Sequence, residues 1–218
     1  MQILLHTNKT SRGDLNMSEN NNSKNNNNDN NGRNDYKNRD LILDGVVNES
    51  SIRKLVEDIL EINKHDRKEK QKNQEYTAKP INIIVNTAGG NLYDANLAVG
   101  IIETSETPVH TYCHSKAMSG GFLIYSAGHK RFATPLATFM YHDGAIGLHD
   151  KIENLKVDLD WYAQLRDQMD EYLLSVTNLP KHIMDMKKRL KEDWYLTAQE
   201  AFGYGLVDEI IPFRKYNK

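Results

Sequence analysis

Three residues of the types that act together in nucleophilic catalysis stand far apart in this chain, each beside a short apolar segment. Ser119 lies in a glycine-bearing turn, His142 follows the apolar segment 138–141, and Asp193 precedes Trp194. A serine hydroxyl becomes a good nucleophile when an imidazole takes its proton, and a carboxylate can hold that imidazole in the required tautomer. The three residues therefore predict acyl-transfer chemistry, provided that the fold brings them together.

Two glycine turns offer the amide donors that this chemistry needs. Gly120 directly follows the serine and Gly90 ends a second glycine pair, so we expect their N–H groups to stabilise a developing oxyanion. Each residue also has a plainer interpretation: Ser119 as a helix cap, His142 as a structural histidine, and Asp193 as part of a solvated helix end. From spacing alone, the catalytic and the structural interpretations both stay open.

The elements that would position these residues alternate between strand and helix. Short apolar runs predict strands at 41–47, 81–85, 109–113, 131–133 and 138–141. Apolar residues at helical spacing predict helices that begin at Ser51, cover 92–105 and cover 122–127. This alternation indicates an α/β fold with helices on a largely parallel sheet, in which strand ends converge on one rim.

The C-terminal part has a different pattern. A single long helix is predicted over 150–177, and about 26 residues at about 1.5 Å each would span about 40 Å. Such a helix should project from the domain, which favours a homo-oligomer contact over the alternative of purely intramolecular packing. A basic helix is expected from Pro180 to about 191, a capping box at Thr197 and Glu200, and a last strand at 206–211.

Two polar segments interrupt the apolar pattern. The asparagine-rich tract at 20–40 has almost no apolar side chain to bury and is predicted to be disordered. The charged run 65–79 is predicted to be a surface loop. We therefore expect a flexible N-terminal segment, residues 1–40, and a folded domain, residues 41–218.

Composition excludes several function classes. The 28 Lys and Arg residues against 30 Asp and Glu residues leave a net charge of −2, which argues against nucleic acid as a partner. A single cysteine, Cys113, fits a reducing, cytoplasmic setting, and a small buried residue is the favoured interpretation over a thiol nucleophile.

No apolar segment is long enough for a membrane span. No residue cluster has metal-ligand spacing and no glycine loop has a phosphate-binding lysine, so we expect neither a metal nor a cofactor.

Several longer segments resemble the proteolytic subunit of the Clp protease family, among them IIVNTAGG, KAMSGGF and DWYLTAQEAFGYGLVDEII. The resemblance covers residues 41–211 apart from the charged run. It implies a crotonase-like fold of repeated strand-strand-helix units with a projecting handle helix. It also implies a serine peptidase in which Ser119 is the nucleophile, His142 the general base and Asp193 the orienting carboxylate, with the amides of Gly90 and Gly120 as the oxyanion hole.

The same resemblance implies partners. Family members form heptameric rings stacked in pairs around a chamber, and a separate AAA+ unfoldase ATPase feeds them unfolded proteins or peptides. The short segment Thr10–Asp14 is similar to the axial pore hairpin of the family.

The sequence also departs from the family pattern. Ala88 stands where the family has proline, Gly120 where it has methionine, and Asp143 and Gly144 where it has glutamine and proline. The segment 144–151, GAIGLHDK, lacks the usual glycine spacing, which affects substrate register and ring contacts. Alternatives are a phage-type head-maturation peptidase and an inactive ring subunit. A crotonase-type acyl-CoA enzyme is disfavoured because it needs no serine triad.

Overall fold

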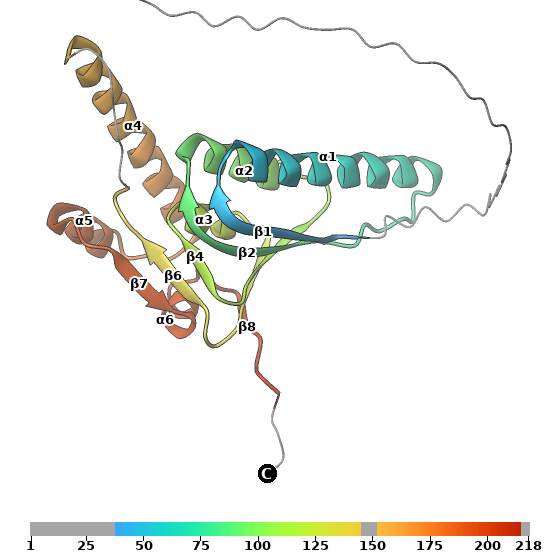
Figure 1. Ribbon diagram of the computed structural model, residues 1–218. Helices are drawn as coiled ribbons and strands as arrows, with labels where there is room; N and C mark the ends of the chain where they lie inside the picture. Colours follow the sequence, from blue (N-terminus) through green and yellow to red (C-terminus); the bar gives the residue numbers. More distant parts are fainter. Residues whose placement is uncertain (1–37, 145–151, 215–218) are drawn as a thin grey trace, which may run out of the picture. The chain divides into compact units, whose positions relative to one another are not determined.

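The computed structural model describes residues 38–144 and 152–214, with side chains described from residue 156 onward in the second range. These residues form a mixed α/β unit (Figure 1). Its elements, in chain order, are β1 (Asp40–Val47), α1 (Glu49–Lys72), β2 (Ile81–Gly90), α2 (Leu92–Glu103), β3 (Val109–Cys113), β4 (Lys116–Met118), α3 (Gly120–Ser126), β5 (Lys130–Ala133), β6 (Thr138–Tyr141), α4 (Ile152–Val176), α5 (Lys181–Leu190), β7 (Trp194–Thr197), α6 (Ala198–Gly203) and β8 (Glu209–Ile210).

The strands form one sheet that divides at β2. The order is β7-β6-β4-β2-β3-β5-β8, and β1 pairs with β2 in addition. The first half of β2 pairs with β3 and its second half with β4, so two branches leave the same strand. Every pairing is parallel except that of β6 with β7. The predicted α/β fold with a largely parallel sheet is confirmed.

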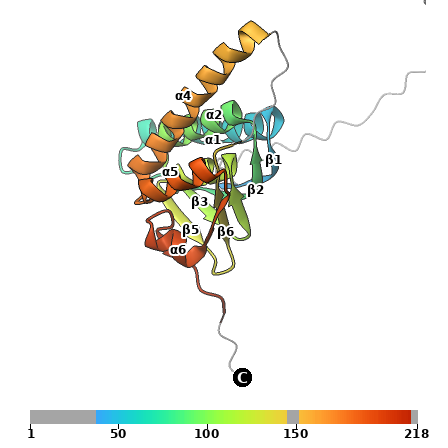
Figure 2. The ribbon, with the colours of Figure 1, turned by 90° about the vertical axis from the view of Figure 1, so that its left-hand side faces the viewer.

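The core lies between the sheet and the helices that cover it. Alternate side chains of β2, among them Ile81, Ile83 and Val85, are fully buried, while α1 contributes Ile52 and Ile59. Every residue of the short helix α3 is buried. Figures 1 and 2 show α1 and α2 side by side over β1 and β2. Burial on this scale holds α3, and the residue that precedes it, in one position.

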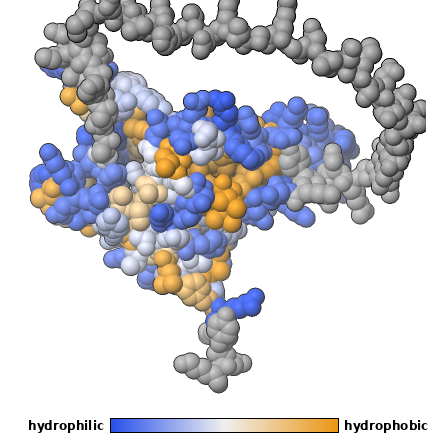
Figure 3. Space-filling view, in the orientation of Figure 1, coloured by the Kyte–Doolittle hydropathy of each residue, from blue (hydrophilic) through white to orange (hydrophobic). Residues whose placement is uncertain are grey.

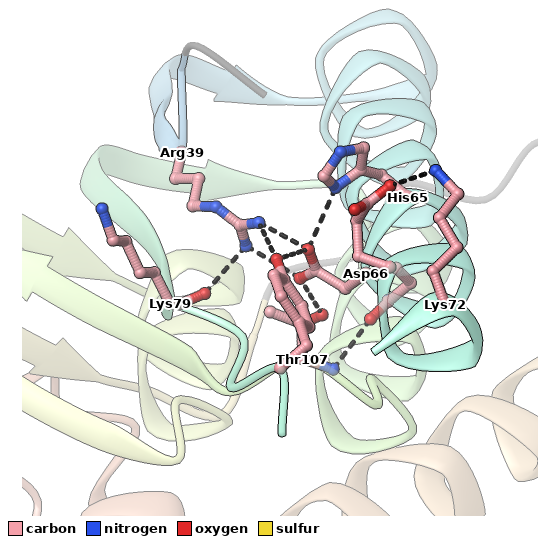
Figure 4. A network of polar contacts seen from close by, with 9 residues as sticks. Arg39, His65, Asp66, Lys72, Lys79 and Thr107 are labelled. Carbon is pink, nitrogen blue, oxygen red and sulfur yellow. Dashed lines mark hydrogen bonds and ion pairs between the residues drawn. The ribbon is translucent and has the colours of Figure 1, made fainter. Parts of the chain in front are cut away.

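The prediction of a loop over 65–79 is wrong in its first part, because α1 continues to Lys72. Asp66 is buried on this helix, and its carboxylate accepts hydrogen bonds from Arg39, Tyr76 and Thr107 (Figure 4). The charged sequence gives no sign of this burial, since the cation that neutralises Asp66 stands before β1. A long-range ion pair therefore keeps a polar segment helical and packed.

Other boundaries differ less. The capping box of Thr197 and Glu200 is confirmed, and Asn48 caps α1 with a second box. Residues 86–90 were predicted to form a turn but belong to β2. Of the predicted strand 206–211, only Glu209–Ile210 is a strand. The short strands β4 and β7 were not predicted. The prediction of disorder over 20–40 is wrong at its end, because Arg39 bonds Asp66 and Asp40 begins β1. The rest of that tract, the segment Thr10–Asp14 and residues 145–151 lie outside the described residues.

Among the described side chains of α4, the buried ones lie in the second half of the helix. Figures 1 and 2 show its first half extending beyond the other elements. In the second half Leu165 and Leu173 are buried, whereas Val157, Leu159 and Trp161 are exposed in the first half. The predicted projection is therefore present, although Trp161 and Tyr162 of the first half still contact Tyr93 of α2.

Among the strands that the structure describes, β1 lies at an outer edge of the sheet and pairs with β2 alone. Ile42 and Val46 on this strand are exposed, and Figure 3 shows apolar surface over β1 beneath the hydrophilic surface of α1. An open strand edge with apolar side chains is a surface that proteins usually cover.

Candidate active site

The antiparallel pairing of β6 with β7 places His142 opposite Asp193. Tyr141 pairs with Trp194, so the next residue of each strand, His142 after β6 and Asp193 before β7, lies at the same end of the ladder. His142 Nδ1 lies 3.5 Å from Asp193 Oδ1. This separation is an ion-pair distance rather than a good hydrogen bond. The side chain of Asp193 is 48% exposed, so its carboxylate faces both the histidine and solvent.

The neighbouring strand β4 brings Ser119 to the same edge. Met118 pairs with Met140 of β6, and the amide of Ser119 donates to the carbonyl of Met140 over 2.9 Å. The Oγ atom of Ser119 lies 2.8 Å from Nε2 of His142. A hydroxyl and an imidazole at hydrogen-bond distance are what proton transfer from serine requires.

The backbone of Ser119 is in a strained conformation. Its φ of 52° is positive, which among the described non-glycine residues occurs only here and at Lys191. The serine precedes α3, yet its side chain makes no capping hydrogen bond to that helix. Ser119 thus stands at the N-cap position of α3 but does not cap the helix with its side chain, which points to His142 instead. A strained serine on a sharp turn between strand and helix is typical of a nucleophile elbow.

The glycine pair at the end of β2 lies against this turn. Gly89 has a φ of 102°, and a Cβ atom there would lie 2.7 Å from Cβ of Ser119. A Cβ atom on Gly120 would lie 3.7 Å from the amide nitrogen of Gly90, so these two backbones are adjacent. Gly120 is the first residue of α3, where the N–H group has no partner within the helix. The sequence pattern indicated Gly90 and Gly120 but missed Gly89, whose only signal is its place in the pair.

A pocket of about 570 Å³ opens beside Ser119 and His142 and is also lined by Gly90 and Gly120. Its apolar lining includes Phe122, Leu123, Tyr162, Met169 and Leu173. Charged side chains line another part of it, namely Asp143, Arg166 and Asp170. The volume and the mixed lining are typical of a site that takes one or a few side chains of a ligand.

Other candidate chemistry is less well placed. Cys113 is fully buried, and burial raises the pKa of its thiol to about 12, so the interpretation as a buried structural residue is confirmed. Within residues 38–144 and 152–214, no three His, Cys, Asp or Glu side chains gather as metal ligands would. In the same part of the chain, no helix is long and apolar enough to cross a membrane.

Two known proteins are similar to this chain in sequence. The chain is 29% identical over 140 residues to the ATP-dependent Clp protease proteolytic subunit of Deinococcus radiodurans, over 63% of this chain and 68% of that protein. It is 27% identical over 178 residues to the ATP-dependent Clp protease proteolytic subunit 1 of Rhodopirellula baltica, over 80% of this chain and 73% of that one.

The fold is also that of a solved structure. A mutant of ClpP1 from Listeria monocytogenes superposes with a TM-score of 0.67 at 21% identity, over 81% of this chain and 92% of the other. The predicted crotonase-like fold of the ClpP type is therefore confirmed. The family model of the Clp protease matches residues 23–214. Because that match covers nearly the whole chain, this protein belongs to the Clp protease family.

Proposed function

We propose that this protein is a serine endopeptidase that hydrolyses peptide bonds through an acyl-enzyme on Ser119. One observation carries the proposal: Ser119 Oγ lies 2.8 Å from His142 Nε2, on a strained turn at the mouth of a pocket. Membership in the Clp protease family makes proteins or peptides the expected substrates. A crotonase-type acyl-CoA enzyme would have no use for this serine–histidine contact.

The geometry supports the usual sequence of steps. His142 Nε2 takes the proton of Ser119 as its Oγ attacks the scissile carbonyl, and the oxyanion that forms lies near the amides of Gly90 and Gly120. His142 then gives the proton to the leaving amine, the C–N bond breaks and the acyl-enzyme remains. A water molecule, deprotonated by His142, attacks the ester and restores the serine. Asp193 stabilises the imidazolium in both halves of the reaction.

Asp193 fits this role incompletely in the single chain. Its 3.5 Å separation from His142 has to shorten for a hydrogen bond, and solvent screens a carboxylate that is 48% exposed. Contacts of this kind commonly tighten only when substrate is bound. We therefore assign Asp193 as the orienting carboxylate of the substrate-bound enzyme.

The proposal extends to assembly. The exposed Val157, Leu159 and Trp161 on the projecting half of α4, and the open apolar edge of β1, support a homo-oligomer, with heptameric rings stacked in pairs as the expected form. Both curated relatives carry the words "ATP-dependent" in their names. An AAA+ unfoldase as a separate partner would supply that dependence here.

Active-site labelling tests the assignment. The purified protein is incubated with a fluorophosphonate and its intact mass is measured beside Ser119→Ala and a control, Ser115→Ala, which removes an exposed serine from the preceding loop. We expect a single adduct on the wild type and on the control, and none on Ser119→Ala. An adduct on Ser119→Ala would refute the assignment of the nucleophile.

The same measurement separates the rival functions. No adduct on a correctly assembled wild-type oligomer would favour an inactive ring subunit. An adduct together with cleavage of folded scaffold-like proteins in the absence of any ATPase would favour a phage-type head-maturation peptidase.

A further inference from the structure

A carboxylate that is largely shielded from solvent, that of Asp170, joins the strand of His142 to two helices. Asp170 on α4 accepts a hydrogen bond from the Tyr141 hydroxyl at Oδ1, over 2.7 Å, and one from Lys188 Nζ at Oδ2, over 2.6 Å. Tyr141 is buried, and the side chains of Lys188 and Asp170 are only 18% and 14% exposed. Each oxygen of one carboxylate thus bonds a different element, β6 or α5.

Both partners of Asp170 lead directly into the proposed triad. Tyr141 is the residue before His142. Lys188 lies in the last turn of α5, and the chain then passes through the left-handed cap Lys191 to reach Asp193. Fixing Tyr141 and Lys188 to the same carboxylate therefore limits how far His142 and Asp193 can move apart.

A second contact holds the other side of His142. Asp143, the residue that follows it, forms an ion pair with Arg166 over 3.1 Å. Arg166 lies one turn before Asp170 on α4, so the same face of this helix contacts the residues on both sides of the histidine. The base of the projecting helix is thereby connected to the catalytic edge of the sheet.

We infer that Asp170 is a positioning residue for the proposed hydrolysis, which it serves by holding His142 and Asp193 in register through Tyr141 and Lys188. The inference rests on the proposed function, because it assigns no chemistry of its own to Asp170. The hydroxyl of Tyr141 is the group to test. Phenylalanine would fill the same core position but has no hydroxyl to donate to the Asp170 carboxylate. Asp170 is the shared acceptor of both donors, so a change at Tyr141 or at Asp170 acts on the same set of contacts, while Lys188 keeps Asp167 as a second partner.

Steady-state peptide cleavage and the rate of fluorophosphonate labelling test the inference. Tyr141→Phe keeps the ring and removes one hydrogen bond, and Asp170→Asn removes the charge. Because small displacements of reacting groups slow catalysis strongly, we expect each variant to lower kcat and the labelling rate by on the order of 10-fold, with KM unchanged. The double variant should be no slower than the slower single variant, since both changes weaken the same contact.

Two variants on the same helix serve as matched controls. Tyr172 donates to Glu103, so Tyr172→Phe removes another tyrosine–carboxylate bond of α4 that lies outside the pocket. Asp167 contacts Lys188 and Arg166, each over 3.2 Å, so Asp167→Asn removes an acidic partner of the same lysine and leaves both hydrogen bonds to Asp170 in place. Both controls should keep the wild-type kcat and labelling rate.

The outcomes are distinguishable. The inference is overturned if Tyr141→Phe labels as fast as the wild type, if Tyr172→Phe slows labelling equally, or if KM rises while kcat is unchanged. Should Asp170→Asn fail to fold, as judged by its melting temperature, Tyr141→Phe decides alone. A wild-type protein that does not label at all refutes the proposed function, whereas labelling that is insensitive to Tyr141→Phe refutes only the positioning role.

Discussion

Replacing Asp66 by asparagine should destabilise the fold strongly although the residue lies in a charged segment far from the active site. The Asp66 carboxylate accepts two hydrogen bonds from Arg39, over 2.5 and 2.9 Å, and one each from Tyr76 and Thr107, both over 2.7 Å. Its side chain is 7% exposed and that of Arg39 is 13% exposed. Asparagine would leave the guanidinium buried without a counter-ion, and breaking one side of a buried ion pair costs about 3–5 kcal/mol.

Urea unfolding at a fixed protein concentration measures this loss. With an m-value of about 3 kcal/mol per molar, Asp66→Asn should lower the unfolding midpoint by about 1 M or more. The control is Asp58→Asn, which removes the partly exposed i,i+4 partner of the exposed Lys54 on the same helix and should shift the midpoint far less. Equal shifts in the two variants would refute the assignment of Asp66 as a structural ion pair.

The pH dependence of stability in acid tests the role of Asp66 independently. Burial alone would raise the pKa of Asp66, but the hydrogen bonds from Arg39, Tyr76 and Thr107 outweigh burial and hold the pKa well below its usual value. A lowered folded-state pKa contributes stability above the unfolded value of about 3.9, and this contribution is lost as the pH falls further. The wild type should therefore approach Asp66→Asn in stability below about pH 4. A difference that stays constant down to pH 2 would contradict the argument.

Three further outcomes are expected. Gly89→Ala should lower the free energy of unfolding by about 2–4 kcal/mol and slow the labelling of Ser119, because Gly89 has a positive φ and a Cβ atom there would clash with Ser119. A normal urea midpoint together with normal labelling would contradict this. His142→Ala should reduce turnover by on the order of 10³ or more without changing assembly by size-exclusion chromatography. Cys113 should resist thiol reagents until urea unfolds the protein, because burial keeps its thiol protonated.

Local signals in the sequence were sufficient for much of the fold. The uniformly apolar run 81–85 can only be a buried strand, and the side chains of Thr197 and Glu200 bond backbone atoms within one turn, so both features follow from neighbouring residues. The same holds for the glycine turn around Ser119 and for His142 at a strand end. These patterns depend on residues a few positions apart, which a linear sequence displays directly.

Contacts between distant residues were decided by the tertiary structure alone. The antiparallel register of β6 with β7 sets Asp193 opposite His142, and β7 has no strong strand signal of its own. The burial of Asp66 depends on Arg39, and the link from Tyr141 through Asp170 to Lys188 joins three elements. From the sequence alone, a charged side chain is predicted to be exposed to solvent. Its burial becomes favourable only when an opposite charge from elsewhere in the chain pairs with it, and the sequence does not show that partner. The sequence therefore determined which residue types were available for catalysis, and packing decided which of them face one another.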